Sequence, residues 1–193
     1  MTISFRSAAA AAIAVSVASS ALAQRLPTTV SLLDYKTTVP SAWSPRTPSS
    51  TSRLAEYYVA AGTDNAAVVE VVVYFFGKTQ GGNVQANLTR WKGQFSTPDG
   101  SPVPETISRD STGLFPITFA EYRGTYRRGI GAGSADSVRT GQTLIAAIAE
   151  TPRGTMFIQM FGPSAQVATQ RDEFMKFVRG LKDSSGPGDD STR

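Results

Sequence analysis

Residues Val68 to Phe76 read VVEVVVYFF, a run in which every side chain except that of Glu70 is β-branched or aromatic. Such side chains favour extended backbone. A strand that is apolar at both odd and even positions is typical of one buried on both faces of a sheet. We therefore predict a central strand here. Glu70 is expected to lie at an edge or to pair with an arginine, or alternatively to act as a functional carboxylate in a pocket.

Further strands are predicted on both sides of this run. Two apolar segments joined by Thr151-Pro152-Arg153-Gly154 are expected to form a hairpin, and Trp43 is expected to fill part of the core. The Gly-rich stretch at 129–140 is expected to be a loop. The predicted strands are Leu32 to Val39, Arg53 to Ala60, Leu114 to Tyr126, Thr143 to Glu150, and Thr155 to Phe161.

Two amphipathic helices are predicted from their apolar spacing. The first follows Gly81-Gly82 and begins at Asn83, a favourable N-cap residue. The second begins at Ser164, which we expect to cap it, and ends near Gly180. In each case large side chains recur every three or four residues and so line one face. These are Val84, Leu88, Trp91 and Phe95 in the first helix, and Val167, Phe174, Phe177, Val178 and Leu181 in the second.

The predicted order of elements is β-β-β-α-β-β-β-α. Hairpin-linked strands with two long amphipathic helices indicate an α+β domain, in which both helices pack on an antiparallel sheet. We place this single domain at residues 39–182, after a Pro- and Thr-containing segment at 24–38. The last residues, 183–193, have little to bury and are expected to form a disordered tail.

The N-terminus indicates export. Arg6 precedes an apolar run from Ala8 to Val17, and small residues ending in Ala21-Leu22-Ala23 follow it. This pattern is typical of a secretory signal peptide at residues 1–23, and the run is too short to span a bilayer. No twin-arginine pair precedes it, so we expect the Sec route, a periplasmic or extracellular location, and no stable membrane anchor after cleavage.

Composition excludes several kinds of chemistry. The chain of 193 residues contains no Cys and no His, and its formal net charge is +4. Disulfides, thiolate nucleophiles and His-dependent catalytic triads are therefore excluded. The modest charge also argues against nucleic acid as a partner. We assign no catalytic residue, no metal site and no cofactor from the sequence.

Three stretches resemble a group of exported bacterial proteins of unknown function: RLAEYYV at 53–59, VVEVVVYFFGKTQGGNVQANLTRWKGQF at 68–95, and TLIAAIAETPRGTMFIQMFGPSAQVATQRDEFMKFVRGL at 143–181. The resemblance covers roughly residues 39–181. The layout is also similar to that of PsbP-like domains, whose known members are accessory binding proteins. The resemblance implies a fold and a non-catalytic role, and it carries over no site residue.

The densest basic and aromatic cluster is a candidate binding surface. It lies at residues 123–128, RGTYRR, and Arg139 follows nearby in the sequence. Arginine suits planar contacts with carboxylates and phosphates. The alternative interpretation is a solvated edge strand whose charges discourage pairing with other sheets. The residues predicted to contact an anion or partner are Arg123, Tyr126, Arg127, Arg128 and Arg139.

Three functions follow as hypotheses. The first is an exported, non-catalytic binding or accessory protein for a protein or envelope component, acting as a monomer or weak oligomer. The second is a carboxylate-dependent enzyme using Glu70, Glu121 or Asp110, which requires two of these groups to approach one substrate bond. The third is attachment to an anionic envelope polymer through the arginines of the cluster.

Overall fold

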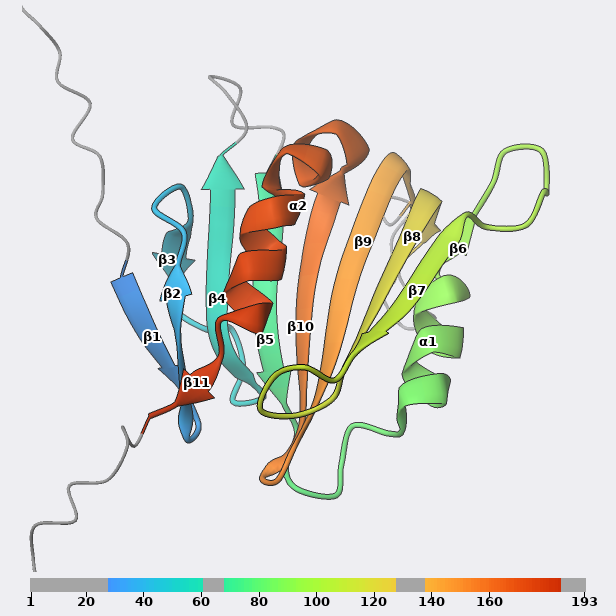
Figure 1. The fold of residues 1–193 in the computed structure, drawn as a ribbon. Coiled ribbons are helices and arrows are strands. Elements are labelled where there is room, and N and C mark those ends of the chain that lie inside the picture. The colour runs from blue at the N-terminus through green and yellow to red at the C-terminus, as the bar shows by residue number, and fades with distance from the viewer. Residues whose placement is uncertain (1–27, 61–67, 128–137, 185–193) are drawn as a thin grey trace, which may run out of the picture.

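The computed structural model describes residues 28–60, 68–127 and 138–184, and the proposed signal peptide lies outside them. Within these ranges the chain forms a large sheet of eight strands and a small sheet of three, with two helices (Figure 1). All strand pairs are antiparallel, so the predicted α+β class is confirmed. Neither described helix combines the length and apolar character needed to cross a bilayer.

The large sheet has the strand order β3-β4-β5-β10-β9-β8-β6, and β7 also pairs with β8. The small sheet has the order β1-β2-β11. The bounds are β1 Thr28–Leu32, β2 Tyr35–Val39, β3 Ser44–Arg46, β4 Arg53–Ala60, β5 Val68–Phe75, α1 Val84–Lys92, β6 Phe95–Ser96, β7 Glu105–Asp110, β8 Ile117–Arg127, β9 Val138–Thr151, β10 Gly154–Pro163, α2 Ser164–Arg179 and β11 Lys182–Asp183.

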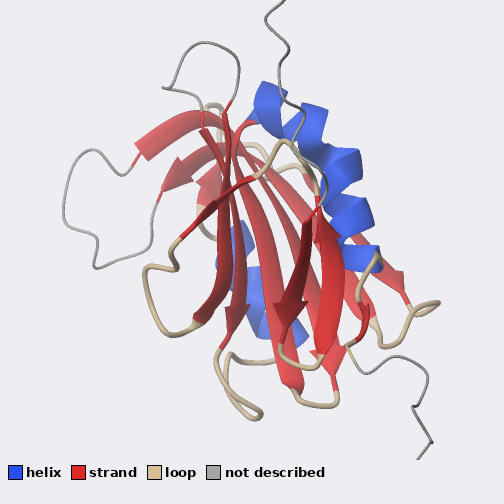
Figure 2. Cartoon of the chain, turned by 90° about the vertical axis from the view of Figure 1, so that its left-hand side faces the viewer, coloured by secondary structure: helices blue, strands red, loops and turns tan. Residues whose placement is uncertain are grey.

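The two helices lie on opposite faces of the large sheet (Figure 2). Alternate side chains of a strand point to opposite faces, and β5 follows this rule. Val69, Val71 and Val73 are fully buried on the face that α2 covers, which we call the α2 face. Val72 points to the other face, the α1 face, and is 3% exposed. The predicted two-sided burial of this strand is therefore confirmed.

The core on the α2 face is the larger of two apolar clusters. The predicted apolar stripe of α2 is buried in it, and Phe174 belongs to the same cluster as Val71 and Val73. Trp43 is also buried there, as predicted, and its indole Nε1 donates to Gln170 Oε1 on α2 at 3.2 Å. Burying each large side chain contributes about 1.5–3 kcal/mol before entropy is subtracted.

The core on the α1 face lies under the first helix. Leu88 and Trp91 pack there against β8, β9 and β10. Asn83 caps the helix as predicted, since its side chain accepts from the Ala86 N–H at 2.8 Å. The buried Tyr122 hydroxyl donates to the Leu88 carbonyl at 3.1 Å and joins α1 to the sheet. Trp91 thus lies on the opposite face of the sheet from Val71 and Val73.

Several boundaries differ from the predictions. The first helix ends at Lys92, and Phe95 begins β6, although it keeps its place in the core on the α1 face. Ser164 does not cap α2, because the N-cap residue is Pro163. The Ser164 hydroxyl instead donates to the Gly141 carbonyl at 2.9 Å and accepts from Thr143 Oγ1 at 2.8 Å. The polar strand β7 was not predicted. Part of the expected Gly-rich loop lies outside the described residues, and β9 begins at Val138.

Residues expected to flank the domain take part in it. Leu32 and Tyr35, within the segment predicted at 24–38, are buried in the core on the α2 face. The strand predicted at Leu32 to Val39 corresponds to β2, and β1, which was not predicted, precedes it in a tight hairpin whose turn has Leu33 at φ 57°. The Thr37 hydroxyl donates to the Phe177 carbonyl of α2 at 2.6 Å. Asp183, predicted to begin the tail, pairs with Tyr35 in the small sheet.

Because the two cores lie on opposite faces, substitutions in them are expected to act independently. Ile158→Val on the α2 face should lower the free energy of unfolding by about 0.5–1.5 kcal/mol, and Leu88→Ala on the α1 face by about 2–5 kcal/mol. The losses in the double variant should add to within about 0.5 kcal/mol in urea denaturation. A much larger coupling would show that the two cores are not separate.

Candidate functional site

The α1 face of the sheet is only partly covered by its helix. The buried side chains beneath α1 come from β6, β8, β9 and β10, and β5 contributes only the partly buried Tyr74. No residue of β4 belongs to this core among the described residues. The remainder of the face, over β3, β4 and β5, carries Glu56, Tyr58 and Glu70, and these side chains form the candidate site.

Strand geometry brings this group together. Ala55, Tyr57 and Val59 of β4 point to the α2 face, so the alternate residues Glu56 and Tyr58 point to the α1 face. Tyr58 stands directly opposite Glu70, and Arg53 opposite Tyr74, in the β4–β5 register. We call Ser49, Arg53, Glu56, Tyr58 and Glu70 the Arg53 cluster.

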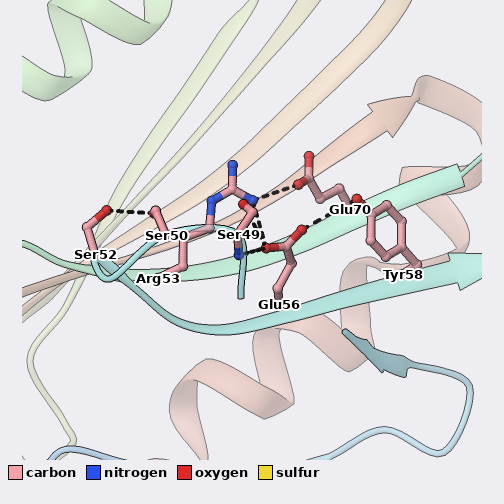
Figure 3. Close-up of polar contacts among 7 residues, drawn as sticks. All are labelled: Ser49, Ser50, Ser52, Arg53, Glu56, Tyr58 and Glu70. Carbon is pink, nitrogen blue, oxygen red and sulfur yellow. Dashed lines mark hydrogen bonds and ion pairs between the residues drawn. The ribbon is translucent and has the colours of Figure 1, made fainter. Parts of the chain in front are cut away.

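A single guanidinium nitrogen joins the two carboxylates of the Arg53 cluster (Figure 3). Arg53 Nη1 lies 3.0 Å from Glu56 Oε2 and 3.0 Å from Glu70 Oε1. Glu56 Oε2 also accepts from the backbone N–H of Ser49 at 3.2 Å and from its hydroxyl at 3.3 Å. These contacts attach the segment before β4 to the sheet and hold both carboxylates in place.

Glu56 and Glu70 differ in exposure. The Glu56 side chain is 5% exposed, whereas that of Glu70 is 32% exposed. Burial alone would raise the pKa of Glu56, but the Ser49 N–H and the Arg53 guanidinium outweigh it and hold the pKa below its usual value. Glu56 is therefore an ionised, structural member of the cluster, and Glu70 is the carboxylate that reaches solvent.

Aromatic rings flank the charged groups. The Arg46 guanidinium lies 4.1 Å from the Tyr58 ring centroid, and that of Arg53 lies 5.3 Å from the Tyr74 ring centroid. Tyr74 in turn stacks on Phe76, which is 41% exposed. Cation–π contacts of this kind are favourable even at exposed sites. The surface therefore presents charged and aromatic groups whose positions are fixed by the sheet.

The three carboxylates proposed for catalysis do not come together. Glu70 lies on the α1 face with Arg53. Glu121 lies on the α2 face, where it pairs with Arg123 at 2.7 Å and with Arg171 of α2. Asp110, at the end of β7, pairs with Arg179 of α2 at 2.9 Å. Each carboxylate thus has its own arginine partners and its own place on the sheet.

Asp110 borders a small hollow of about 80 Å³ at the C-terminal end of α2. The Thr112 hydroxyl and backbone N–H, followed by Arg179, lower the pKa of Asp110 to about 2. Asp110 therefore has a structural role: it stabilises the turn at Thr112 and forms an ion pair that joins α2 to the sheet. Among the described residues, no group of three or more acidic side chains is arranged to hold a metal ion.

The predicted arginine cluster is divided between the two faces. Arg123 is opposite Thr143 on the α2 face and is paired with Glu121. Arg139 is opposite Tyr126, whose ring packs on the α1 face against Phe161 at 4.5 Å. Arg127 is exposed at the end of β8, and Arg128 lies outside the described residues. Tyr126 is therefore a packing residue, and these arginines do not share one surface.

Sequence reasoning identified Glu70 and its arginine pairing but missed Glu56, Arg53 and Tyr58. The available signal was the alternation in RLAEYYVA at 53–60, which places Glu56 and Tyr58 on one face and Ala55, Tyr57 and Val59 on the other. Pairing that face with Glu70 requires the β4–β5 register. Arg53 faces the same side only because the register shifts between Arg53 and Ala55, and the alternation does not reveal this shift.

Comparison with known proteins identifies the fold. No protein-family model matches the chain, and no curated protein matches its sequence. The structure is similar to the solution structure of cyanobacterial PsbP (CyanoP) from Synechocystis, with a TM-score of 0.50 and 10% identity over 84% of this chain and 95% of that one. A protein of unknown function from Pseudomonas aeruginosa aligns with a TM-score of 0.43 and 11% identity over 83% of this chain and 99% of that one. The first likeness shows a PsbP-like fold and assigns no residue role.

Arg53→Gln should destabilise the protein most near neutral pH. The variant leaves Glu56 ionised, nearly buried and close to Glu70, at an expected cost of about 1–3 kcal/mol in the free energy of unfolding. The depressed pKa of Glu56 means that its stabilising contribution is complete above its unfolded-state pKa and is lost as pH falls through the folded-state pKa. The deficit should therefore shrink between pH 7 and pH 3 in urea denaturation. A deficit that does not vary with pH would contradict this role.

Proposed function

We propose that the chain is an exported, non-catalytic binding or accessory protein whose partner is another protein. The proposed contact surface is the uncovered part of the α1 face, centred on the Arg53 cluster. The observation that carries the proposal is that the Glu70 carboxylate is partly exposed on β5 and is held in position by Arg53. A carboxylate that is both exposed and fixed in position can bind a donor group of a partner protein that lies against this part of the sheet.

The composition of this surface supports a protein partner. Tyrosine and arginine are enriched where proteins bind one another, because they combine apolar area with hydrogen-bonding groups. Tyr58, Tyr74, Arg46 and Arg53 occupy adjoining positions on β3, β4 and β5. The contacts within the Arg53 cluster also keep these side chains ordered before binding, which reduces the entropy lost on association.

Charge indicates what the partner presents. Arg53 is shared between the carboxylates of Glu56 and Glu70, and the second arginine of this surface, Arg46, lies over the Tyr58 ring instead. Within the described part of the chain, Glu70 accepts a hydrogen bond only through Oε1, from Arg53 Nη1, and its Oε2 atom has no partner. A lysine or arginine of the partner would complete the coordination of Glu70 by a charge-assisted hydrogen bond. Tyr58, directly opposite, would contact the aliphatic part of that side chain.

Export is part of the proposal and rests on the sequence of residues 1–23. Expression of the full chain in a bacterial host with a Sec system, followed by fractionation and mass analysis, tests it. The expected product begins at Gln24 and is found outside the cytoplasm, whereas an uncleaved cytoplasmic chain would contradict the proposal.

The alternative of a carboxylate-dependent enzyme is less well supported. Two cooperating carboxyl groups must face the same substrate bond. Glu70 and Glu121 point to opposite faces of the sheet, and Asp110 is engaged in its turn and in the pair with Arg179. The pair that does lie close together, Glu56 and Glu70, shares one guanidinium nitrogen and is occupied in holding the strand surface.

Glu70→Gln and Tyr58→Ala should each weaken binding of the partner while the protein remains folded. The partner is first recovered from envelope extracts with the tagged chain, and its affinity is then measured with purified proteins. We expect a loss of roughly tenfold or more for Glu70→Gln, because a charged hydrogen bond becomes a neutral one. Glu173→Gln, an exposed carboxylate on α2, is the matched control. Equal affinity of all three variants with the unchanged chain would overturn the proposed surface.

A further inference from the structure

Strand β7 is an edge of the large sheet. It pairs with β8 along Glu105 to Asp110, and no other described strand lies against its outer side. Figure 1 shows β7 at the opposite end of the sheet from β3 and β4. Its first five residues are all exposed. Such an edge can pair with a further strand unless its side chains prevent this.

The β7–β8 register determines which backbone groups face outward. The Arg123 N–H donates to the Pro104 carbonyl at 3.3 Å, so Pro104 directs its carbonyl toward β8. In an antiparallel ladder, successive residues direct their N–H and C=O groups alternately inward and outward. Glu105, Ile107 and Arg109 therefore present their backbone groups to the open side of the strand.

The side chains of the same three residues lie on one face. Their cross-strand partners are Tyr122, Ala120 and Thr118, whose alternation places all of them on the α1 face. Ile107 stands in the middle and is 49% exposed. Glu105 lies two residues before it and Arg109 two residues after it. Along this edge an acidic residue and a basic residue therefore lie at equal distances on either side of the apolar Ile107.

We propose that β7 pairs with β7 of a second copy of this chain, antiparallel and with the two-fold axis at Ile107. In that register Ile107 stands opposite its own counterpart, and Glu105 stands opposite Arg109 at both ends. Outward backbone groups of three residues in each copy form about six hydrogen bonds. The two large sheets then become one continuous sheet. This inference goes beyond the proposed function and uses the other end of the sheet.

Self-complementarity identifies a second copy as the occupant. Charged side chains and proline commonly protect an edge strand from pairing. The charges of β7 differ in sign at its two ends, so in the two-fold arrangement each attracts its counterpart instead of repelling it. The existing pairs within each chain extend this pattern, since Lys92 lies 2.6 Å from Glu105 and Arg109 lies 3.2 Å from Glu150. At each end of the interface, positive and negative side chains then alternate. Lys92 and Glu105 of one copy are followed by Arg109 and Glu150 of the other.

Charge reversal tests this arrangement. Sedimentation of the purified chain over a wide concentration range should give a dimer, and Glu105→Arg or Arg109→Glu should each weaken it by about tenfold or more, because two attractive pairs become repulsive. The double variant Glu105→Arg/Arg109→Glu restores opposite charges across the interface and should dimerise more tightly than either single variant. It should stay weaker than the unchanged chain, because the swap places like charges beside Lys92 and Glu150. Arg127→Glu, an exposed charge change on β8, is the control. A monomer at all concentrations, or a double variant no better than the single ones, would refute the proposal.

A cysteine cross-link tests the position of the axis. The chain has no cysteine, so Ile107→Cys introduces a single thiol, which the two-fold axis places beside its counterpart at about 5.5 Å between Cα atoms. Mild oxidation should give a covalent dimer much faster than Leu114→Cys, which changes a similarly exposed residue beyond the end of β7. Equal rates for the two variants would show that Ile107 is not at the axis. Neither experiment involves Glu70 or Tyr58, so its outcome is independent of the proposed partner surface.

Discussion

Burial of the central strands on both faces is the constraint on which the structure depends. Val71 and Val73 of β5 pack under α2, and Val72 is buried on the opposite face. The same alternation continues in β10, where Met156, Ile158 and Met160 belong to one core and Phe157 to the other. Since a chain without cysteine has no disulfide to close it, apolar burial is the main term holding these layers together.

The unequal size of the two helical layers produces the candidate site. Helix α2 covers β5, β9 and β10 on its face, together with the hairpin of β1 and β2. Helix α1 is shorter, and on the opposite face it covers β8, β9 and β10 but not β4. Beyond the buried Val72, the part of β4 and β5 left uncovered carries the polar side chains of Glu56, Tyr58 and Glu70, and the contacts of the Arg53 cluster satisfy these groups. The partial cover of the α1 face thus explains both the exposed Glu70 and its fixed position.

The central strands, both helices and the α+β class were predictable because their patterns come from burial. Strand β7 was not, because ETISRD has exposed side chains on both faces and no apolar alternation. The interpretation of Ser164 as a cap was wrong because its hydroxyl bonds to β9 instead. The predicted arginine cluster was judged by proximity in sequence, whereas the register of β8 and β9 directs Arg123 and Arg139 to opposite faces.

The site shows the same limit. Glu70 was recognisable as a charge within an apolar run, and an arginine partner was expected, but the residue that supplies it could not be identified. Arg53 reaches Glu70 because of the β4–β5 register and the bulge beside Arg53. Contacts within one element can be read from its periodicity, but contacts between elements depend on register, which the same periodicity leaves open by steps of two residues.

Native-state amide hydrogen exchange tests the dependence on two-sided burial most directly. The account predicts that the slowest amides lie in β5, β9 and β10, that they exchange only by global unfolding, and that β1, β3 and β7 exchange much faster. Equal protection of the edge and central strands, or the slowest exchange in the β1–β2 hairpin, would contradict it.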